Sequence, residues 1–85
     1  MPNLNLSQKT IDLLRLLAMP RTAERWKRAD FLVTLYGNKP VQRKLEELSR
    51  RGYIEYGMFP LGWLTDKGKS ILRALDEAAN PEVGP

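Results

Sequence analysis

Four charged residues have the spacing of one helix face and could bind a polyanion. Lys39, Arg43, Glu46 and Arg50 follow one another at intervals of three and four residues. Side chains at this spacing lie on one side of a helix. Ammonium and guanidinium groups bond phosphate oxygens or the O6 and N7 atoms of guanine, and a carboxylate accepts a hydrogen bond from the N4 amine of cytosine. If the segment is helical, its charged face could therefore contact a nucleic acid duplex.

The composition offers little support for an enzyme. The 85-residue chain contains no Cys and no His, which excludes disulfides, thiolate or imidazole metal ligands and imidazole-based catalytic triads. Residues 68–70 resemble the end of a phosphate-binding loop, but Trp63 stands where that motif needs a glycine. Glu46 and Glu47 have basic residues three and four positions away, so helix-surface ion pairs explain them better than acid/base catalysis. We expect no catalytic activity, no cofactor and no bound metal.

The positive charge of the chain is concentrated in its middle third. Fourteen Lys and Arg against ten Asp and Glu give a net charge of +4. Residues 21–51 contain nine of the basic and four of the acidic residues, and therefore the whole excess. Such clustering is typical of a polyanion-binding surface, although a modest net charge can also serve solubility alone.

No segment has the pattern of a membrane span or a signal peptide. No apolar run approaches the roughly 20 residues that cross a bilayer, and the first residues lack a basic-then-apolar sequence. We therefore expect a cytoplasmic protein with no membrane partner.

Two helices are predicted in the first part of the chain. Ser7 can cap a helix over about residues 7–18, which Pro20 ends. Apolar residues at helical spacing predict a second helix over about 26–36, which Gly37 ends.

The first helix is apolar on nearly every side. One of its rows can face the core of the domain, which leaves Leu13, Leu16 or Leu17 to be covered by something else. A second copy of the chain is the expected partner for that row.

The third helix is predicted over about residues 39–51. Asn38 can cap it, and Pro40 is tolerated within its first turn. Gly52 follows its end and permits the reversal from helix to strand at a positive φ. Its apolar stripe consists of Val41, Leu45 and Leu48. The charged face described above lies opposite that stripe and is expected to be free for a ligand.

A small hairpin and a last helix are predicted after the third helix. Residues 53–56 and 63–64 are β-prone and flank a turn, so they are expected to form two strands. Thr65 then caps a helix that ends near residue 79, and Gly68 would let this helix lie close to the hairpin. The breaker-rich segment 80–85 is expected to be disordered.

The order of these elements and one stretch of sequence resemble a known family. Residues 45–55 (LEELSRRGYIE) and 63–69 (WLTDKGK) resemble the winged helix-turn-helix of the multiple-antibiotic-resistance (MarR) and phenolic-acid-decarboxylase (PadR) transcriptional regulators. The resemblance covers about residues 7–79 and implies one winged helix domain over 1–79, mainly α with a small β-hairpin. It further implies transcriptional regulation by sequence-specific binding to double-stranded DNA. The third helix would enter the major groove, in a homodimer that associates through the N-terminal and C-terminal helices.

The resemblance also assigns roles to individual residues of this chain. The expected contacts to base edges are Asn38, Lys39, Gln42, Arg43 and Glu46. The expected contacts to phosphates are Arg25, Lys27, Arg28, Lys44, Arg50 and Arg51. If about five phosphates are neutralised, the logarithm of the affinity should fall with the logarithm of salt concentration at a slope of about −4.5.

The turn of the hairpin departs from the family pattern. Residues 57–62 contain no Lys or Arg, whereas these regulators usually carry basic residues there. Met58, Phe59 and Leu61 would form an exposed apolar patch if the turn protrudes, which favours an alternative function as a protein-protein adaptor. If the turn folds back, the same side chains would instead complete the core.

Overall fold

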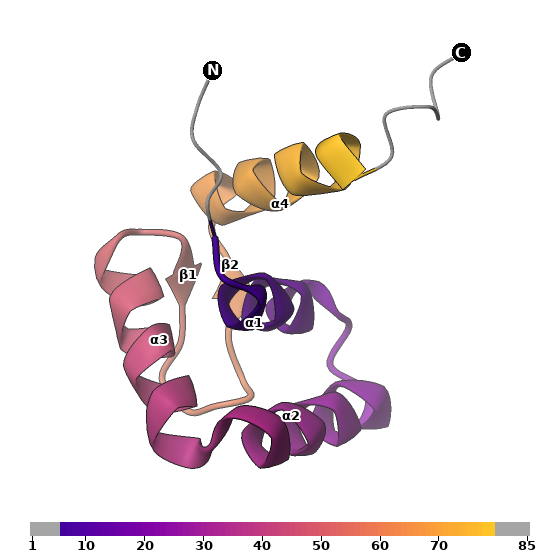
Figure 1. Ribbon diagram of the computed structural model, residues 1–85, viewed down its shortest axis with the longest axis vertical. Helices are drawn as coiled ribbons and strands as arrows, with labels where there is room; N and C mark the ends of the chain where they lie inside the picture. The colour runs from indigo at the N-terminus through magenta and orange to yellow at the C-terminus, as the bar shows by residue number, and fades with distance from the viewer. Residues whose placement is uncertain (1–5, 80–85) are drawn as a thin grey trace.

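A computed structural model describes residues 6–79 of the chain. This part is mainly helical with one small antiparallel sheet of two strands, as the sequence predicts (Figure 1). The elements are α1 (Gln8–Ala18), α2 (Ala23–Tyr36), α3 (Asn38–Arg50), β1 (Ile54–Glu55), β2 (Trp63–Leu64) and α4 (Asp66–Ala79). The disorder predicted for residues 80–85 concerns a segment outside the described residues, as do residues 1–5 of the predicted domain.

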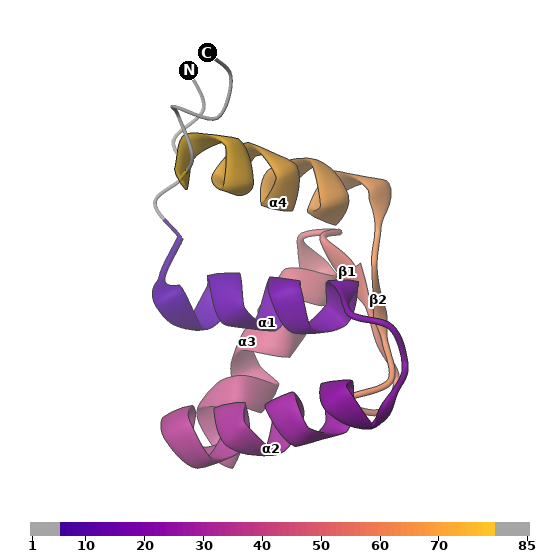
Figure 2. The same cartoon turned by 90° about the vertical axis from the view of Figure 1, so that its right-hand side faces the viewer.

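Helix α1 is the centre of the molecule. It lies between α2 and α4, and the hairpin runs past one end of all three helices (Figure 2). Helix α3 packs against α2, α1 and β1. In the hairpin, Ile54 pairs with Leu64 and Glu55 pairs with Trp63. This arrangement leaves α3 with neighbours on one side only.

The core is assembled around α1. The buried apolar side chains are Leu13, Leu14, Leu16, Leu17, Ala29, Leu32, Val41, Leu45, Leu48, Ile54 and Leu64. The expectation that a leucine row of α1 is left for a second subunit is therefore wrong. Because α2, α3, α4 and β2 all contact α1, the chain itself covers every leucine of this helix.

The starts of the first three helices agree only in part with the predicted starts. The Ser7 hydroxyl accepts a hydrogen bond from the Thr10 amide at 3.2 Å, which caps α1 as predicted. The prediction that Asn38 caps α3 is wrong, because Asn38 is the first helical residue and Gly37 precedes it with a φ of 95°. Helix α2 begins at Ala23, earlier than predicted, after Thr22 in an extended conformation.

Gly68 allows α4 to lie against the hairpin, as the sequence predicts. A Cβ atom at this position would overlap the carbonyl oxygen of Tyr53, and it would lie 3.4 Å from a methyl carbon of Leu64. The backbone amide of Gly68 donates a hydrogen bond to the Thr65 hydroxyl at 3.2 Å, which caps the start of α4. The backbone of α4 therefore lies in close contact with Tyr53, the residue before β1.

We expect Gly68→Ala to lower the free energy of unfolding by roughly 1–3 kcal/mol, because the added methyl group forces two packed backbones apart. Gly57→Ala is the matched control, since nothing lies within 4 Å of a Cβ there and its φ is not positive. Urea denaturation followed by circular dichroism measures both variants. Equal stability of the two would contradict the close packing of α4.

Candidate nucleic-acid interface

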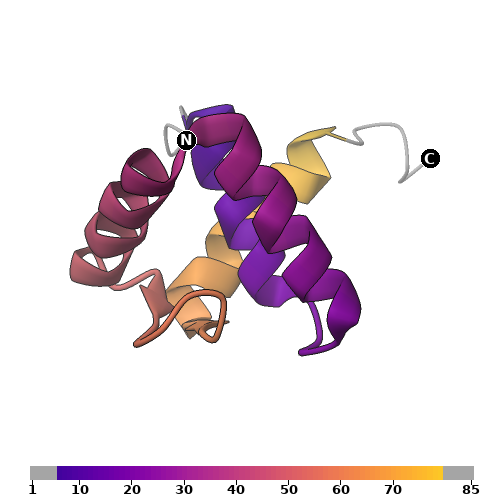
Figure 3. The ribbon, with the colours of Figure 1, turned by 90° about the horizontal axis from the view of Figure 1, so that it is seen from below.

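The charged face of α3 points away from the molecule. Val41, Leu45 and Leu48 are each no more than 3% exposed and anchor α3 on the core. Because successive residues are rotated by about 100° around a helix, four charged residues lie on the side opposite this stripe. They are Lys39, Arg43, Glu46 and Arg50, all exposed. Figure 3 shows α3 at the edge of the molecule, so this face is accessible along its length.

Three cations on this face form no ion pair with the described part of the chain. Lys39, Arg43 and Arg50 make no ion pair within residues 6–79. Each therefore keeps a full set of donors for an external anion. Glu46 is likewise without an ion pair in the same part of the chain, and it is the single carboxylate among these outward residues.

Two other cations of this segment are paired with a carboxylate of the protein itself. Glu47 binds Lys44 at 2.9 Å and Arg51 at 3.6 Å. The hydrogen bond and the charge of Lys44, followed by the charges of Arg51 and Arg50, lower the pKa of the Glu47 carboxyl. Glu47 is therefore ionised at neutral pH and offsets positive charge on this flank. The predicted helix-surface ion pairs form at Glu47 and not at Glu46.

Arg25 is internal, and the prediction that it contacts phosphate is wrong. It is 3% exposed. Its guanidinium donates to the carbonyl oxygens of Leu17 and Met19 at 3.1 Å, and to those of Pro60 and Gly62 at 2.9 Å. Burial, followed by the charge of Arg21, lowers the pKa of Arg25. Because its donors are used by carbonyls at the end of α1 and in the hairpin turn, none is left for a ligand.

The sequence contained a signal for this burial. Arg25 lies one turn before Ala29 and Leu32 on the same helical row, and both of those residues belong to the core. Extending the apolar stripe of α2 backward by one turn therefore places Arg25 on the inner face.

Lys27 and Arg28 are exposed but lie apart from α3. Both line a hollow of about 280 Å³ together with Met19, Glu24 and Phe31, and no residue of α3 borders it. The guanidinium of Arg28 is 5.6 Å from the centre of the Phe31 ring. The structure thus does not bring these two predicted phosphate contacts together with the charged face of α3.

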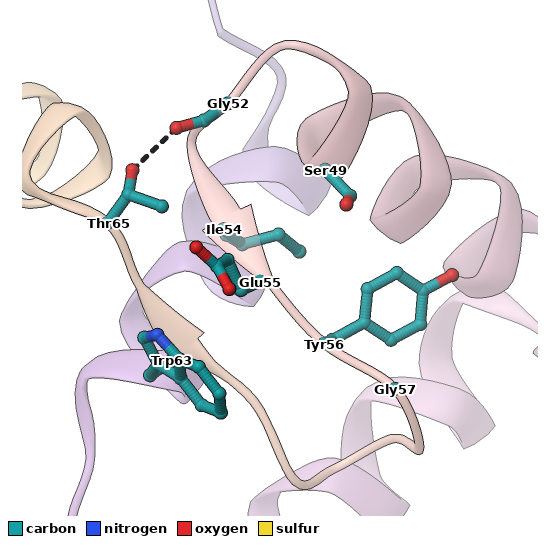
Figure 4. Close-up of a pocket in the computed structure, with 8 residues that line it drawn as sticks. All are labelled: Ser49, Gly52, Ile54, Glu55, Tyr56, Gly57, Trp63 and Thr65. Carbon is teal, nitrogen blue, oxygen red and sulfur yellow. Dashed lines mark hydrogen bonds between the residues drawn. The ribbon is translucent and has the colours of Figure 1, made fainter.

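A groove borders the hairpin and the end of α3. It has a volume of about 540 Å³ (Figure 4) and is lined by Ser49, Gly52, Ile54, Glu55, Tyr56, Gly57, Trp63 and Thr65. Of the predicted base contacts, Asn38 is exposed at the start of α3, and Gln42 is half-buried on the same flank as Ser49. Sequence reasoning missed Tyr56, which extends from the end of β1 toward α3 in Figure 4. Its residue type gave no signal, since an aromatic residue beside a short strand usually belongs to the core.

The hairpin turn is partly folded back onto the core and partly exposed, so each of the two sequence-based interpretations holds for some of its residues. Phe59 folds back and packs against the core. Met58 and Leu61 remain at the surface, with 71% and 40% of their area exposed. The apolar patch predicted for the turn is therefore reduced to two of its three residues.

Other kinds of site find no support in the described part of the chain. Within residues 6–79, no three His, Cys, Asp or Glu side chains gather closely enough to hold a metal ion. Among the helices of the same residues, none combines the length and the apolar composition that a membrane crossing requires. Comparison of the chain with protein-family models, with curated proteins and with solved structures finds no match. The function must therefore be inferred from the geometry of α3 and the hairpin.

Proposed function

We propose that this chain is a winged helix-turn-helix domain that binds double-stranded DNA and regulates transcription. In this proposal α2 and α3 form the helix-turn-helix, the hairpin is the wing, and α3 enters the major groove. The observation that carries the proposal is the presence of three exposed cations, Lys39, Arg43 and Arg50, which lie opposite the buried stripe of α3 and make no ion pair within residues 6–79. A helix with an accessible charged face fits the width of the major groove of B-DNA.

The exposed side chains of α3 divide into two kinds of contact. Arg43, near the middle of the face, would bond the O6 and N7 of a guanine, and Gln42 would bond the N6 and N7 of an adenine. Glu46 would accept from the N4 amine of a cytosine. Lys39 and Asn38, at the start of α3, lie within reach of the same groove. Arg50, at the far end of α3, would bind a phosphate and fix the register of the helix.

The number of cations outside ion pairs determines the expected salt dependence of DNA binding. Arg25 is internal, and Lys44 and Arg51 are paired with Glu47, so three cations of α3 remain for phosphates or bases. On a random-sequence duplex, where no base is preferred, all three would bind phosphates, so about three counterions would be displaced and the salt slope should be about −2.7 rather than −4.5.

Binding to a labelled duplex tests the proposal directly. Fluorescence anisotropy with random-sequence DNA at low salt should give a dissociation constant in the micromolar range, because the phosphate contacts need no specific sequence. Selection of bound duplexes from a random pool should then yield a preferred sequence. A palindrome would show that two copies bind together. Absence of any binding at low salt would refute the proposal.

The exposed turn of the hairpin favours a second candidate function. Met58 and Leu61 form an apolar surface that a phosphate backbone does not need. A winged helix that serves as a protein adaptor would dock through these residues and would bind no duplex. Changing both to serine should leave DNA binding unaltered if the first proposal holds.

A homodimer remains a prediction, but the surface expected to join the two copies is different. Because the leucines of α1 are buried in the core of the same chain, they cannot form the contact between copies. The exposed Phe31 and Leu35 on α2, or the outer side of α4, would have to take part instead.

A further inference from the structure

The hydroxyl group of Tyr56 has no hydrogen-bond partner in the described part of the chain. By contrast, the hydroxyl of Tyr36 donates to Asp12 at 2.7 Å. The hydroxyl of Tyr56 makes no hydrogen bond within residues 6–79. The ring of Tyr56 is half-buried and packs against the core, so its direction is fixed although its hydroxyl meets water.

The side chain of Tyr56 points toward α3 (Figure 4). Tyr56 and Glu55 extend from opposite sides of β1, and the ring of Tyr56 reaches toward α3 (Figure 4). Ser49 lines the same groove. Because Glu46 precedes Ser49 by three residues, it lies on the same side of α3, one turn nearer the start of the helix.

The direction of the pKa shift of Tyr56 agrees with a position near Glu46. Burial, followed by the negative charge of Glu46, raises the pKa of Tyr56. The phenol therefore keeps its proton at neutral pH and acts as a donor. Glu46 has no ion pair within residues 6–79, so its oxygens are available to accept.

We infer that Tyr56 is a positioning residue for Glu46 in the DNA-bound protein. When a duplex displaces water from this part of α3, the Tyr56 hydroxyl donates to one carboxylate oxygen of Glu46. The other oxygen then accepts from the exocyclic amine of a base. This inference rests on the proposed function.

The physical reason is the cost of removing water from a carboxylate. A desolvated carboxylate that lacks donors is destabilised, and a donor from the hairpin reduces this penalty. Because the Tyr56 ring is already packed, little conformational freedom is lost when the bond forms. The hydroxyl is neutral, so it contributes to affinity without changing the number of displaced counterions.

A double-mutant cycle separates this role from a structural one. The wild-type protein, Tyr56→Phe, Glu46→Ala and the double variant are each titrated with the selected duplex and with duplexes altered at the base pair that Glu46 contacts. Tyr56→Phe keeps the packed ring, so its thermal unfolding should match the wild type. It should weaken binding to the selected duplex by about three- to tenfold and reduce the preference for the contacted base pair by the same factor. In the Glu46→Ala background, the same change should have no further effect.

Any of the following results would overturn the inference. Additive losses in the two variants, or an equal loss on every duplex, would show that Tyr56 acts on the DNA backbone and not through Glu46. Wild-type affinity in Tyr56→Phe would remove any role for the hydroxyl. If the wild type binds the duplex, these results leave the proposed function intact, whereas failure of the wild type to bind would overturn both.

Discussion

Replacing Arg25 with alanine is expected to lower the free energy of unfolding by about 3 kcal/mol or more. The change leaves the carbonyl oxygens of Leu17, Met19, Pro60 and Gly62 without their donor. These carbonyls come from the end of α1 and from the hairpin turn, so the variant also loses the bridge between two distant segments. For a domain of this size, the melting temperature should fall by roughly 12 °C or more. Thermal unfolding followed by circular dichroism measures the effect.

Two further substitutions serve as controls for Arg25. Arg28→Ala removes a cation from the same helix at an exposed position and should change the stability by no more than about 0.5 kcal/mol. Arg25→Lys keeps the charge, but a single ammonium group cannot reach carbonyls on both sides of the guanidinium, so most of the loss should remain. If Arg25→Ala were as stable as Arg28→Ala, the internal role of Arg25 would be refuted.

Arg43→Ala should relax the preference for one base pair by roughly 1–3 kcal/mol. Arg43 is exposed near the middle of the α3 face and has no ion pair within residues 6–79, so its guanidinium is free to bond two atoms of a guanine. The measurement compares the affinity of the selected duplex with that of its single-base variants. The loss should be confined to one position of the site.

Arg50→Ala is the matched change for a phosphate contact. It should weaken binding to every duplex to the same extent and reduce the salt slope by about 0.9. Arg28→Ala, which removes the same charge away from α3, should leave both quantities nearly unchanged. Equal losses on every duplex for Arg43→Ala and Arg50→Ala would show that Arg43 does not read a base.

The sequence predicted those features that depend on neighbouring residues. The stripe of Val41, Leu45 and Leu48 fixed the outward face of α3, because helical periodicity alone determines which side is buried. Gly52 adopts the expected positive φ of 83° after α3. Gly68 occupies the expected close contact with the residue before β1. Each of these requires only local geometry and the order of the elements.

The features that sequence reasoning missed depend on contacts between distant segments. Arg25 was assigned to the surface by its charge, whereas its partners lie as much as 37 residues away in the hairpin turn. The leucines of α1 were assigned in part to a second subunit because the number of elements around α1 was unknown. Tyr56 became a candidate only once the hairpin was seen to lie beside α3.

The dependence of duplex affinity on salt concentration tests the central proposal most directly. The dissociation constant for one random-sequence duplex, on which these cations bind phosphates, would be measured by fluorescence anisotropy across a series of salt concentrations. Three unpaired cations on α3 predict that log affinity falls with log salt at a slope of about −2.7. A slope near zero, or no binding at the lowest salt concentration, would contradict the proposal that this face of α3 binds DNA.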